Sequence, residues 1–269
     1  MGLFTIMTGK YCASGGGVNR TGEWDQVFVG FSRDGVHWFR PTVNEKHVPF
    51  LRMNDSIVRR PSDDWPWNKA MVQSVGGGFT VANDGTDGHA DAEQLAMRFY
   101  ASGRGGVDQL SGWPVKAGSG SASTSVAEMR RDGFASLRQS SSAAGLLVTR
   151  LIEFSPSKTV LFINADGADG LTISVQDARG MPLPGLAAGD FRGTAETNGT
   201  RLAVRWAGGT DALRVVAGRP VRFTVRFASR SAALYSFWVA SDECGASQGW
   251  VAAGGRGFNA SIDRHGSCR

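Results

Sequence analysis

Short stretches of alternating apolar and polar residues dominate the second half of the chain. The clearest is 221–227, where Val and Phe take every other position and Arg, Thr and Arg fall between them. Because successive side chains of a strand point to opposite faces, this segment is predicted to be a strand with one buried face. Glycine-rich turn signals separate similar segments, which lie at 146–153, 159–164, 171–177, 201–206 and 234–239. Strands joined by tight turns without helices favour a β-sandwich.

The first half carries a hairpin signal instead of regular alternation. An apolar run at 28–31 is followed by Asp34-Gly35 and then by Trp38. Asp tolerates the turn and Gly supplies a positive φ, so this dipeptide predicts a β-hairpin. Asp-Gly recurs at Asp84 and Asp132, a spacing of roughly 50 residues that is about the length of a four-stranded propeller blade. The pattern therefore predicts propeller-like blades in this half.

Composition supports an all-β chain. The 269 residues include 37 Gly, 15 Phe and 8 Trp, a mixture typical of many short strands with glycine turns and aromatic side chains between sheets. Runs rich in Gly and Ser at 115–125 and 138–145 are predicted loops. The predicted domains are partial propeller blades over 1–140, a β-sandwich over 141–245 and a C-terminal tail over 246–269.

Charge and motifs exclude several classes of function. The net charge of +5 comes mostly from scattered Arg residues, with no basic helix or basic patch, which argues against nucleic-acid binding. No apolar run is long enough to span a membrane. Cysteine and histidine spacing predicts no metal site, and no phosphate loop or other cofactor motif occurs. His37, His47, His89 and His265 are expected at the surface or in packing roles.

Four N-x-Ser/Thr sequons point to a secreted or cell-surface glycoprotein. They lie at Asn19, Asn54, Asn198 and Asn259, whereas chance predicts roughly one. Cys244 and Cys268 are candidates for a disulfide in such a compartment. No signal peptide is visible in the first residues, so we expect the chain to lack an N-terminal portion of its parent.

Eight segments in order resemble one family. They are 30–38, 99–103, 129–137, 161–166, 174–180, 204–206, 218–221 and 234–237, and the tail 245–255 is also similar. The series resembles the C-terminal half of proteins related to glycoside hydrolase family 32, which have a five-bladed β-propeller followed by a β-sandwich. In propeller hairpins of the form Ser-x-Asp-Gly-x-x-Trp, the Asp ties the turn and the Trp wedges between blades, which implies these roles for Asp34 and Trp38.

The resemblance also implies that catalytic parts are missing. The family's nucleophile Asp lies in the first blade, an Arg-Asp pair in the second and the general acid Glu near the third, whereas this chain matches from about the third or fourth blade. The Arg33-Asp34 pair belongs to a hairpin turn and is not the family's Arg-Asp-Pro motif. No family catalytic residue is carried over to this sequence.

Two acidic clusters beside aromatic residues are the candidate sugar sites. Glycoside hydrolysis needs two carboxylates, about 5–5.5 Å apart for retention and roughly 6.5–9.5 Å for inversion. Asp25 and Asp64 are the candidate catalytic carboxylates, and their neighbours Glu23, Trp24, Trp65, Trp67 and Asn68 are the candidate substrate-binding residues. The alternative is that both clusters are solvated loops whose Trp rings pack between blades.

These observations predict a carbohydrate-active protein whose ligand is a glycan. A chain without the leading blades is expected to be inert as an enzyme, even if its full-length parent is a glycoside hydrolase. Two alternatives stay open, a non-catalytic glycan-binding module and a structural extracellular protein with neither activity.

Overall fold

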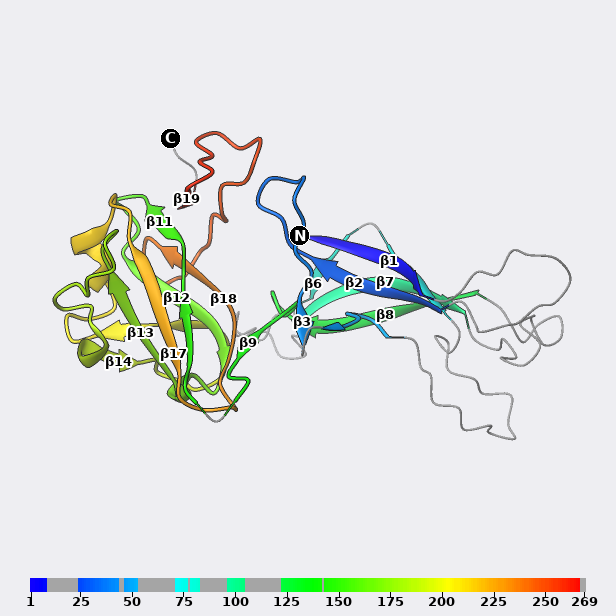
Figure 1. The fold of residues 1–269 in the computed structure, drawn as a ribbon, viewed down its shortest axis with the longest axis horizontal. Coiled ribbons are helices and arrows are strands. Elements are labelled where there is room, and N and C mark those ends of the chain that lie inside the picture. Colours follow the sequence, from blue (N-terminus) through cyan, green and yellow to red (C-terminus); the bar gives the residue numbers. More distant parts are fainter. Residues whose placement is uncertain are drawn as a thin grey trace, which may run out of the picture. The chain divides into compact units, whose positions relative to one another are not determined.

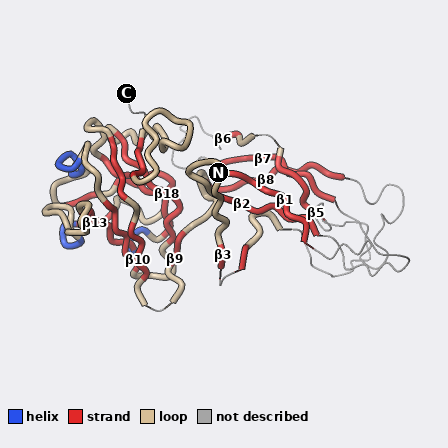
Figure 2. The backbone as a smooth tube through the Cα atoms, turned by 45° about the horizontal axis from the view of Figure 1, so that its top comes forward, coloured by secondary structure: helices blue, strands red, loops and turns tan. Residues whose placement is uncertain are grey.

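The computed structural model of this chain consists mainly of β-strands and loops (Figures 1 and 2). The structure describes residues 1–8, 24–43, 46–52, 71–76, 78–82, 96–104, 122–141 and 143–266. Within these ranges the helical segments are short 3-10 turns, which are η2 (Ala168–Gly170), η3 (Ala188–Asp190) and η4 (Ala212–Val216). The prediction of an all-β chain is confirmed.

The chain divides into two units, of which the first contains Met1–Ala82 and Ala96–Met129 and the second contains Arg130–Arg269. Most strands of the first unit form one six-stranded sheet, made of β1 (Gly2–Thr8), β2 (Trp24–Gly30), β5 (Met71–Val75), β6 (Thr80–Ala82), β7 (Ala96–Arg104) and β8 (Ala122–Arg130). The short strands β3 (Thr42–Val43) and β4 (Lys46–His47) pair with each other. Propeller blades are separate sheets of four strands, so the division of this unit into blades stays a prediction.

Local residue patterns explain the sheet of the first unit. β1 and β2 are antiparallel over their whole length, from Gly2 opposite Gly30 to Thr8 opposite Trp24. β5 and β6 pair with successive parts of β7. Val27, Val72 and Ala101 form a small buried cluster on these strands, which gives the sheet one apolar face.

The predicted hairpin after β2 is present. Phe31 and Phe39 exchange two backbone hydrogen bonds of 2.8 Å, and Gly35 has a φ of +75°. Asp34 Oδ1 accepts the N–H groups of Val36 at 2.9 Å and His37 at 2.7 Å. The hydrogen bond from the His37 ring and these two N–H donors hold the pKa of Asp34 well below its usual range. Asp34 therefore ties the turn, as the sequence predicts.

Trp38 follows this turn. The resemblance implies that its ring wedges between blades, but the ring is only partly enclosed. Its ring packs edge-on against Phe4, with 5.0 Å between centroids, and its Nε1–H donates to the Gly35 carbonyl at 3.1 Å. The residue nevertheless stays 43% exposed. One side of the ring packs on the sheet and the other faces solvent.

Replacing Trp38 is therefore expected to have a moderate effect. Trp38→Ala should lower the free energy of unfolding of the first unit by about 1–2 kcal/mol, because only part of the aromatic area is buried, against the 3–5 kcal/mol typical of a fully buried ring. A denaturant titration measures the loss. Val36→Ala, at a residue that is 75% exposed, is the control and should change little. A loss above about 3 kcal/mol would show that the ring is enclosed.

The described part of the second unit contains four sheets. The four-stranded sheet has the order β15-β12-β18-β9 and the three-stranded sheet the order β10-β17-β13, while β11 pairs with β19 and β14 with β16. The strands are β9 (Leu137–Arg138), β10 (Gly145–Val148), β11 (Leu151–Phe154), β12 (Val160–Asp166), β13 (Leu171–Gln176), β14 (Phe191–Gly193), β15 (Gly199–Ala203), β16 (Arg205–Trp206), β17 (Arg222–Phe227), β18 (Ala233–Ala240) and β19 (Ile262–His265).

One hydrophobic core joins the two larger sheets of this unit. The predicted alternation in β17 is confirmed, because Phe223, Val225 and Phe227 are buried while Arg226 is exposed. These three side chains share a cluster with Leu161 and Ile163 of β12 and with Ile173 and Val175 of β13. A β-sandwich requires such a shared core, and the assignment of this unit to the sandwich class stays a prediction.

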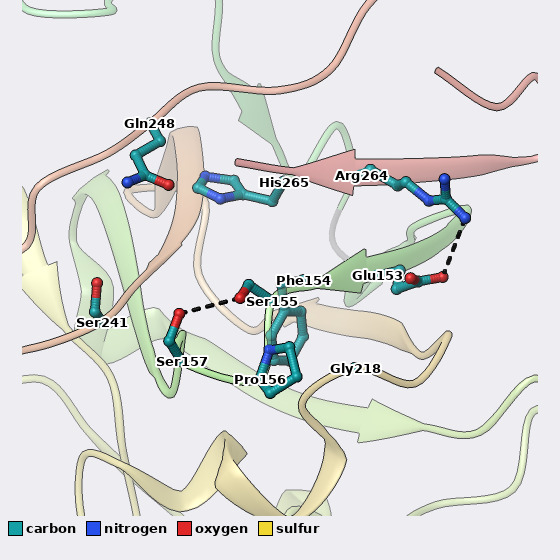
Figure 3. Close-up of a pocket in the computed structure, with 10 residues that line it drawn as sticks. All are labelled: Glu153, Phe154, Ser155, Pro156, Ser157, Gly218, Ser241, Gln248, Arg264 and His265. Carbon is teal, nitrogen blue, oxygen red and sulfur yellow. Dashed lines mark hydrogen bonds and ion pairs between the residues drawn. The ribbon is translucent and has the colours of Figure 1, made fainter. Parts of the chain in front are cut away.

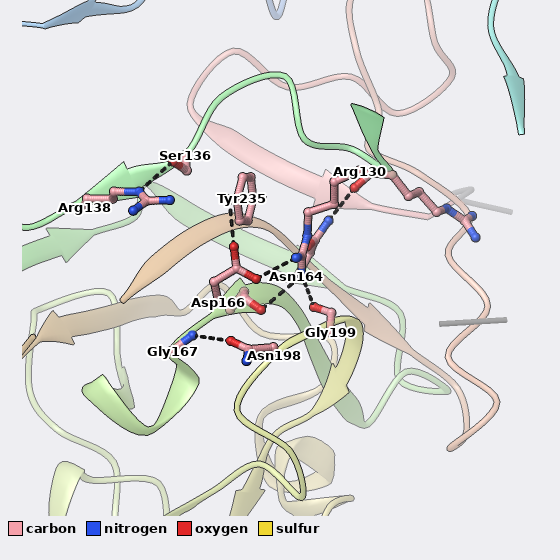
Figure 4. Close-up of polar contacts among 11 residues, drawn as sticks. Arg130, Ser136, Arg138, Asn164, Asp166, Gly167, Asn198, Gly199 and Tyr235 are labelled. Atoms are coloured by element: carbon pink, nitrogen blue, oxygen red, sulfur yellow. Dashed lines mark hydrogen bonds and ion pairs between the residues drawn. The ribbon is translucent and has the colours of Figure 1, made fainter. Parts of the chain in front are cut away.

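Arg130 is the first residue of the segment 130–269 of the second unit, and the predicted domain boundary at 138–145 stays a prediction. Its guanidinium donates to Asn164 Oδ1 at 2.5 Å, to Asp166 Oδ1 at 2.6 Å and to the carbonyls of Ala165 and Gly199 (Figure 4). It also lies 4.8 Å from the centroid of the Tyr235 ring, and the Tyr235 hydroxyl donates to Asp166 Oδ2 at 2.9 Å. These contacts join Arg130 to β12, β15 and β18 within the second unit.

Candidate functional site

A polar pocket of about 560 Å³ lies where β11 ends beside β19. Its lining comes from Glu153, Phe154, Ser155, Pro156, Ser157, Gly218, Ser241, Gln248, Arg264 and His265 (Figure 3). We call it the β11–β19 pocket. Both strands run parallel, with Glu153 opposite Arg264 and Phe154 opposite His265. Segments more than a hundred residues apart in the sequence therefore form one site.

Local turns shape the two walls. After β11 the chain reverses, and the Lys158 N–H donates to the Ser155 carbonyl at 2.8 Å. On the other wall, Val251 N–H donates to the Arg264 carbonyl and Gly266 N–H to the Gly249 carbonyl, both at 2.8 Å. These bonds hold the segment around Gln248 against the end of β19, so that Gln248 and His265 lie side by side in Figure 3.

Gly266 is required for this arrangement. Its φ is +89°, and a Cβ atom there would lie 2.7 Å from Lys158 Cε and 3.2 Å from Gln248 Oε1. A side chain at this position would therefore be strained and would displace the Lys158 side chain. Gly266 therefore leaves room for the Lys158 side chain beside Gln248.

His265 is the most unusual side chain of the pocket. It is 3% exposed, and neither ring nitrogen has a hydrogen-bond partner among the described residues. The Trp250 ring packs edge-on against it, with 4.6 Å between centroids. Burial, helped by the positive charge of Lys158, lowers the pKa of His265 to about 4. At neutral pH the ring is therefore uncharged, with one nitrogen able to donate a hydrogen bond and the other able to accept one.

Lys158 is a second perturbed group, which lies near His265 but is not among the described residues that line the pocket. It is 2% exposed, and its Nζ donates to the Val239 carbonyl of β18 at 3.2 Å. Burial lowers the pKa of Lys158, because a low-dielectric environment disfavours the charged form. Perturbed titratable groups in a cleft mark a candidate functional site on physical grounds.

One carboxylate lines the pocket. Glu153 Oε2 lies 3.7 Å from a terminal nitrogen of Arg264, and both side chains are about 30% exposed. The Arg264 Nε–H is buried without an acceptor among the described residues, although another guanidinium nitrogen donates to the Gly257 carbonyl at 3.0 Å. Among the described residues that line the pocket, Glu153 is the one carboxylate, whereas glycoside hydrolysis needs two. The arrangement suits binding through hydrogen bonds.

The structure leaves the predicted sugar-contact clusters untested. Asp64 lies outside the described residues, as do four of the predicted substrate-binding residues, Glu23, Trp65, Trp67 and Asn68. Trp24 and Asp25 are placed in β2 by their backbone only, with Asp25 opposite Met7 of β1 and Met71 of β5. The roles assigned to these residues stay predictions.

Two of the four sequons lie in the described ranges. Asn198 is exposed and its Oδ1 accepts the Gly167 N–H at 2.8 Å. Asn259 is half-buried and its Oδ1 accepts the N–H groups of Ser261 and Ile262. Asn19 and Asn54 lie outside the described residues, so glycosylation stays a prediction at all four. The same holds for a Cys244–Cys268 disulfide, because Cys244 is exposed and Cys268 lies outside the described ranges.

Sequence reasoning missed the importance of His265 and Lys158. Both stand alone in the sequence, without the spacing of a metal site or catalytic triad. Only the parallel pairing of β11 with β19 brings them near each other, and a short strand at the end of a glycine-rich tail gives little sign of its partner. The run Ser155-Pro156-Ser157 marks a turn, which is the one local signal that a rim of hydroxyl groups follows β11.

The described residues contain neither a candidate metal cluster nor a candidate membrane-spanning helix. No cluster of three or more His, Cys, Asp or Glu side chains there is arranged to hold a metal ion. None of the helical segments described has the length and apolar character needed to cross a membrane. Comparison with family models, with curated proteins and with solved structures gave no match to this chain.

Proposed function

We propose that this chain binds a saccharide in the β11–β19 pocket and does not hydrolyse it there. The observation that carries the proposal is the buried, neutral His265 with two unpartnered nitrogens, set among the side chains of Ser157, Ser241 and Gln248. Sugar hydroxyls both donate and accept hydrogen bonds, and this lining offers both kinds of group. The pocket volume of about 560 Å³ lies in the usual range for small-molecule sites.

Sequence resemblance supports the same class of ligand. The segments similar to family 32 proteins include 161–166, 218–221 and 234–237, which belong to the unit that holds the pocket. Our wider proposal is a secreted or cell-surface glycoprotein related to family 32 glycoside hydrolases that acts on or binds glycans. The alternative of a purely structural extracellular protein predicts no sugar binding.

Hydrolysis in this pocket is disfavoured by its charge arrangement. The general acid and the nucleophile or base of a glycosidase are normally two carboxyl groups flanking the scissile bond. Glu153 is paired with Arg264, and the described residues that line the pocket include no second carboxylate for the partner role.

The proposal is tested by isothermal titration calorimetry of the whole chain with a panel of neutral methyl glycosides and oligosaccharides. At least one sugar is expected to bind and to be recovered unchanged. Gln248→Ala should weaken its binding roughly five- to tenfold, the usual effect of losing one or two neutral hydrogen bonds. Gln176→Ala, on β13 and outside the pocket lining, is the matched control and should bind as the wild type does.

Four results would contradict or change the proposal. If no member of the panel binds, the result would favour the alternative of a purely structural protein. Unchanged affinity of Gln248→Ala would move the sugar site elsewhere. Hydrolysis that is lost in Glu153→Gln would make the pocket catalytic, whereas hydrolysis lost in Asp25→Asn or Asp64→Asn would return catalysis to the clusters predicted from the sequence.

A further inference from the structure

Positive charge exceeds negative charge around the β11–β19 pocket. Arg264 has Glu153 as its partner at 3.7 Å. Lys158 has no carboxylate partner among the described residues, and its one acceptor is the Val239 carbonyl at 3.2 Å. An ammonium group that is 2% exposed and faces only a neutral carbonyl is poorly compensated. A bound anion would compensate it.

Unpartnered donors at the same site point to a ligand that accepts hydrogen bonds. The Arg264 Nε–H and the His265 ring nitrogens are buried without partners among the described residues. Buried polar groups in native proteins nearly always have partners, so each exception calls for an explanation. A carboxylate accepts several hydrogen bonds through its two oxygens. It also carries a negative charge, which would compensate the positive charge of Lys158.

The pocket also presents uncharged side chains that can form hydrogen bonds with the hydroxyl groups of a sugar ring. The hydroxyls of Ser155 and Ser157 lie 3.0 Å apart at the rim, and Ser241 and Gln248 line the opposite side (Figure 3). These side chains are uncharged and present donors and acceptors. A ligand with one anionic group and several hydroxyls would match both halves of the lining.

We propose that the β11–β19 pocket selects saccharides that carry a carboxylate. Arg264 and His265 face the carboxylate, the buried charge of Lys158 behind the lining attracts it, and the serine hydroxyls and Gln248 face the ring hydroxyls. This inference rests on the proposed function and adds the class of sugar. Electrostatic attraction to Lys158 supplies the discrimination against neutral sugars. The buried cation, which is costly in the free protein, becomes favourable once the anion is bound.

The test compares methyl β-glucuronide with methyl β-glucoside, which differ only in a carboxylate in place of a hydroxymethyl group. Binding is followed by the NMR signals of the His265 ring and by calorimetry at low ionic strength. The glucuronide is expected to bind tenfold or more tightly than the glucoside, the effect of at least one charge-assisted hydrogen bond. It should also raise the pKa of His265, because a carboxylate near the ring favours the imidazolium, whereas the glucoside should leave that pKa low.

Lys158→Met is the informative variant because it removes the charge and keeps a long apolar stem. Replacing a buried unpaired cation by an apolar side chain should preserve the fold. It should abolish the preference for the glucuronide and leave the glucoside affinity within about twofold. Lys46→Met, at an exposed lysine of β4 in the first unit, is the matched control and should keep the preference.

The outcomes separate this inference from the proposed function. Equal affinity for the two sugars would overturn the inference and leave sugar binding intact. Acetate binding as tightly as the glucuronide would overturn it as well, because the pocket would then recognise an anion without a sugar. Failure of both sugars to bind would overturn the inference together with the proposed function. A preference that survives in Lys158→Met would assign the selectivity to other groups.

Discussion

Acidification from pH 7 to pH 4 is expected to lower the free energy of unfolding of the second unit by about 3 kcal/mol through His265 alone. Burial and the charge of Lys158 lower the pKa of His265 from 6.5 to about 4 in the folded chain. Between these values the unfolded chain binds a proton that the folded chain does not. Each pH unit in that window therefore costs the folded state about 1.4 kcal/mol. The stability contributed by the neutral ring is complete above pH 6.5 and is lost as the pH falls towards 4.

The measurement is a set of urea titrations between pH 7 and pH 4 on the wild type and on His265→Gln. Other groups of the chain titrate in the same window, so the difference between the two proteins isolates His265. That difference should shift by about 3 kcal/mol across the window, with the variant losing less stability on acidification. Lys158 and the Glu153–Arg264 pair are the charged groups beside the ring, and both proteins retain them. A difference that stays constant within about 1 kcal/mol would show that His265 reaches solvent and titrates normally.

Local patterns predicted the elements well wherever neighbouring residues decide the structure. The alternation at 221–227 predicts β17 because a period of two gives a strand one buried face whatever packs against it. Asp34-Gly35 predicts its turn because the Asp side chain and the positive φ of Gly35 are both local features. The all-β class follows from many such signals acting independently.

Features that depend on distant partners escaped the sequence. The exposure of Trp38 depends on which surface lies opposite its ring, and the hairpin motif does not specify that surface. Arg130 donates hydrogen bonds to Asn164 and Asp166, which lie more than thirty residues further along the chain. A lone arginine after a strand carries no sign of its partners.

The pocket is the strongest case of this limit. Lys158 and His265 belong to segments that meet because β19 adds to β11 in parallel, which is a long-range pairing between two strands of four residues. Sequence reasoning ranked sugar-contact residues by aromatic neighbours and so selected Trp24, Trp65 and Trp67. The site supported by geometry instead depends on a buried imidazole, a buried ammonium group and a rim of hydroxyl groups.

Arg130→Ala is expected to destabilise the second unit by about 3 kcal/mol. The guanidinium has four hydrogen-bond acceptors on β12 and β15 and is only 23% exposed. Its removal leaves Asp166 with the Tyr235 hydroxyl as its side-chain partner among the described residues and deprives two backbone carbonyls of a charged donor. Breaking a largely buried ion pair from one side typically costs about 3–5 kcal/mol, and partial exposure of Asp166, at 35%, places this site at the lower end.

Two further variants show what the arginine contributes. Arg130→Lys keeps the charge but loses the planar fork that reaches several acceptors at once, so it should recover less than half of the lost stability. Arg138→Ala is the control, because Arg138 is exposed and makes one long hydrogen bond of 3.5 Å to Ser136 Oγ. It should change the free energy of unfolding by less than about 0.5 kcal/mol. Urea titration of the wild type and the three variants measures these changes in the free energy of unfolding. A loss below about 1 kcal/mol in Arg130→Ala, or full recovery by lysine, would mean that the guanidinium contacts do not stabilise the second unit.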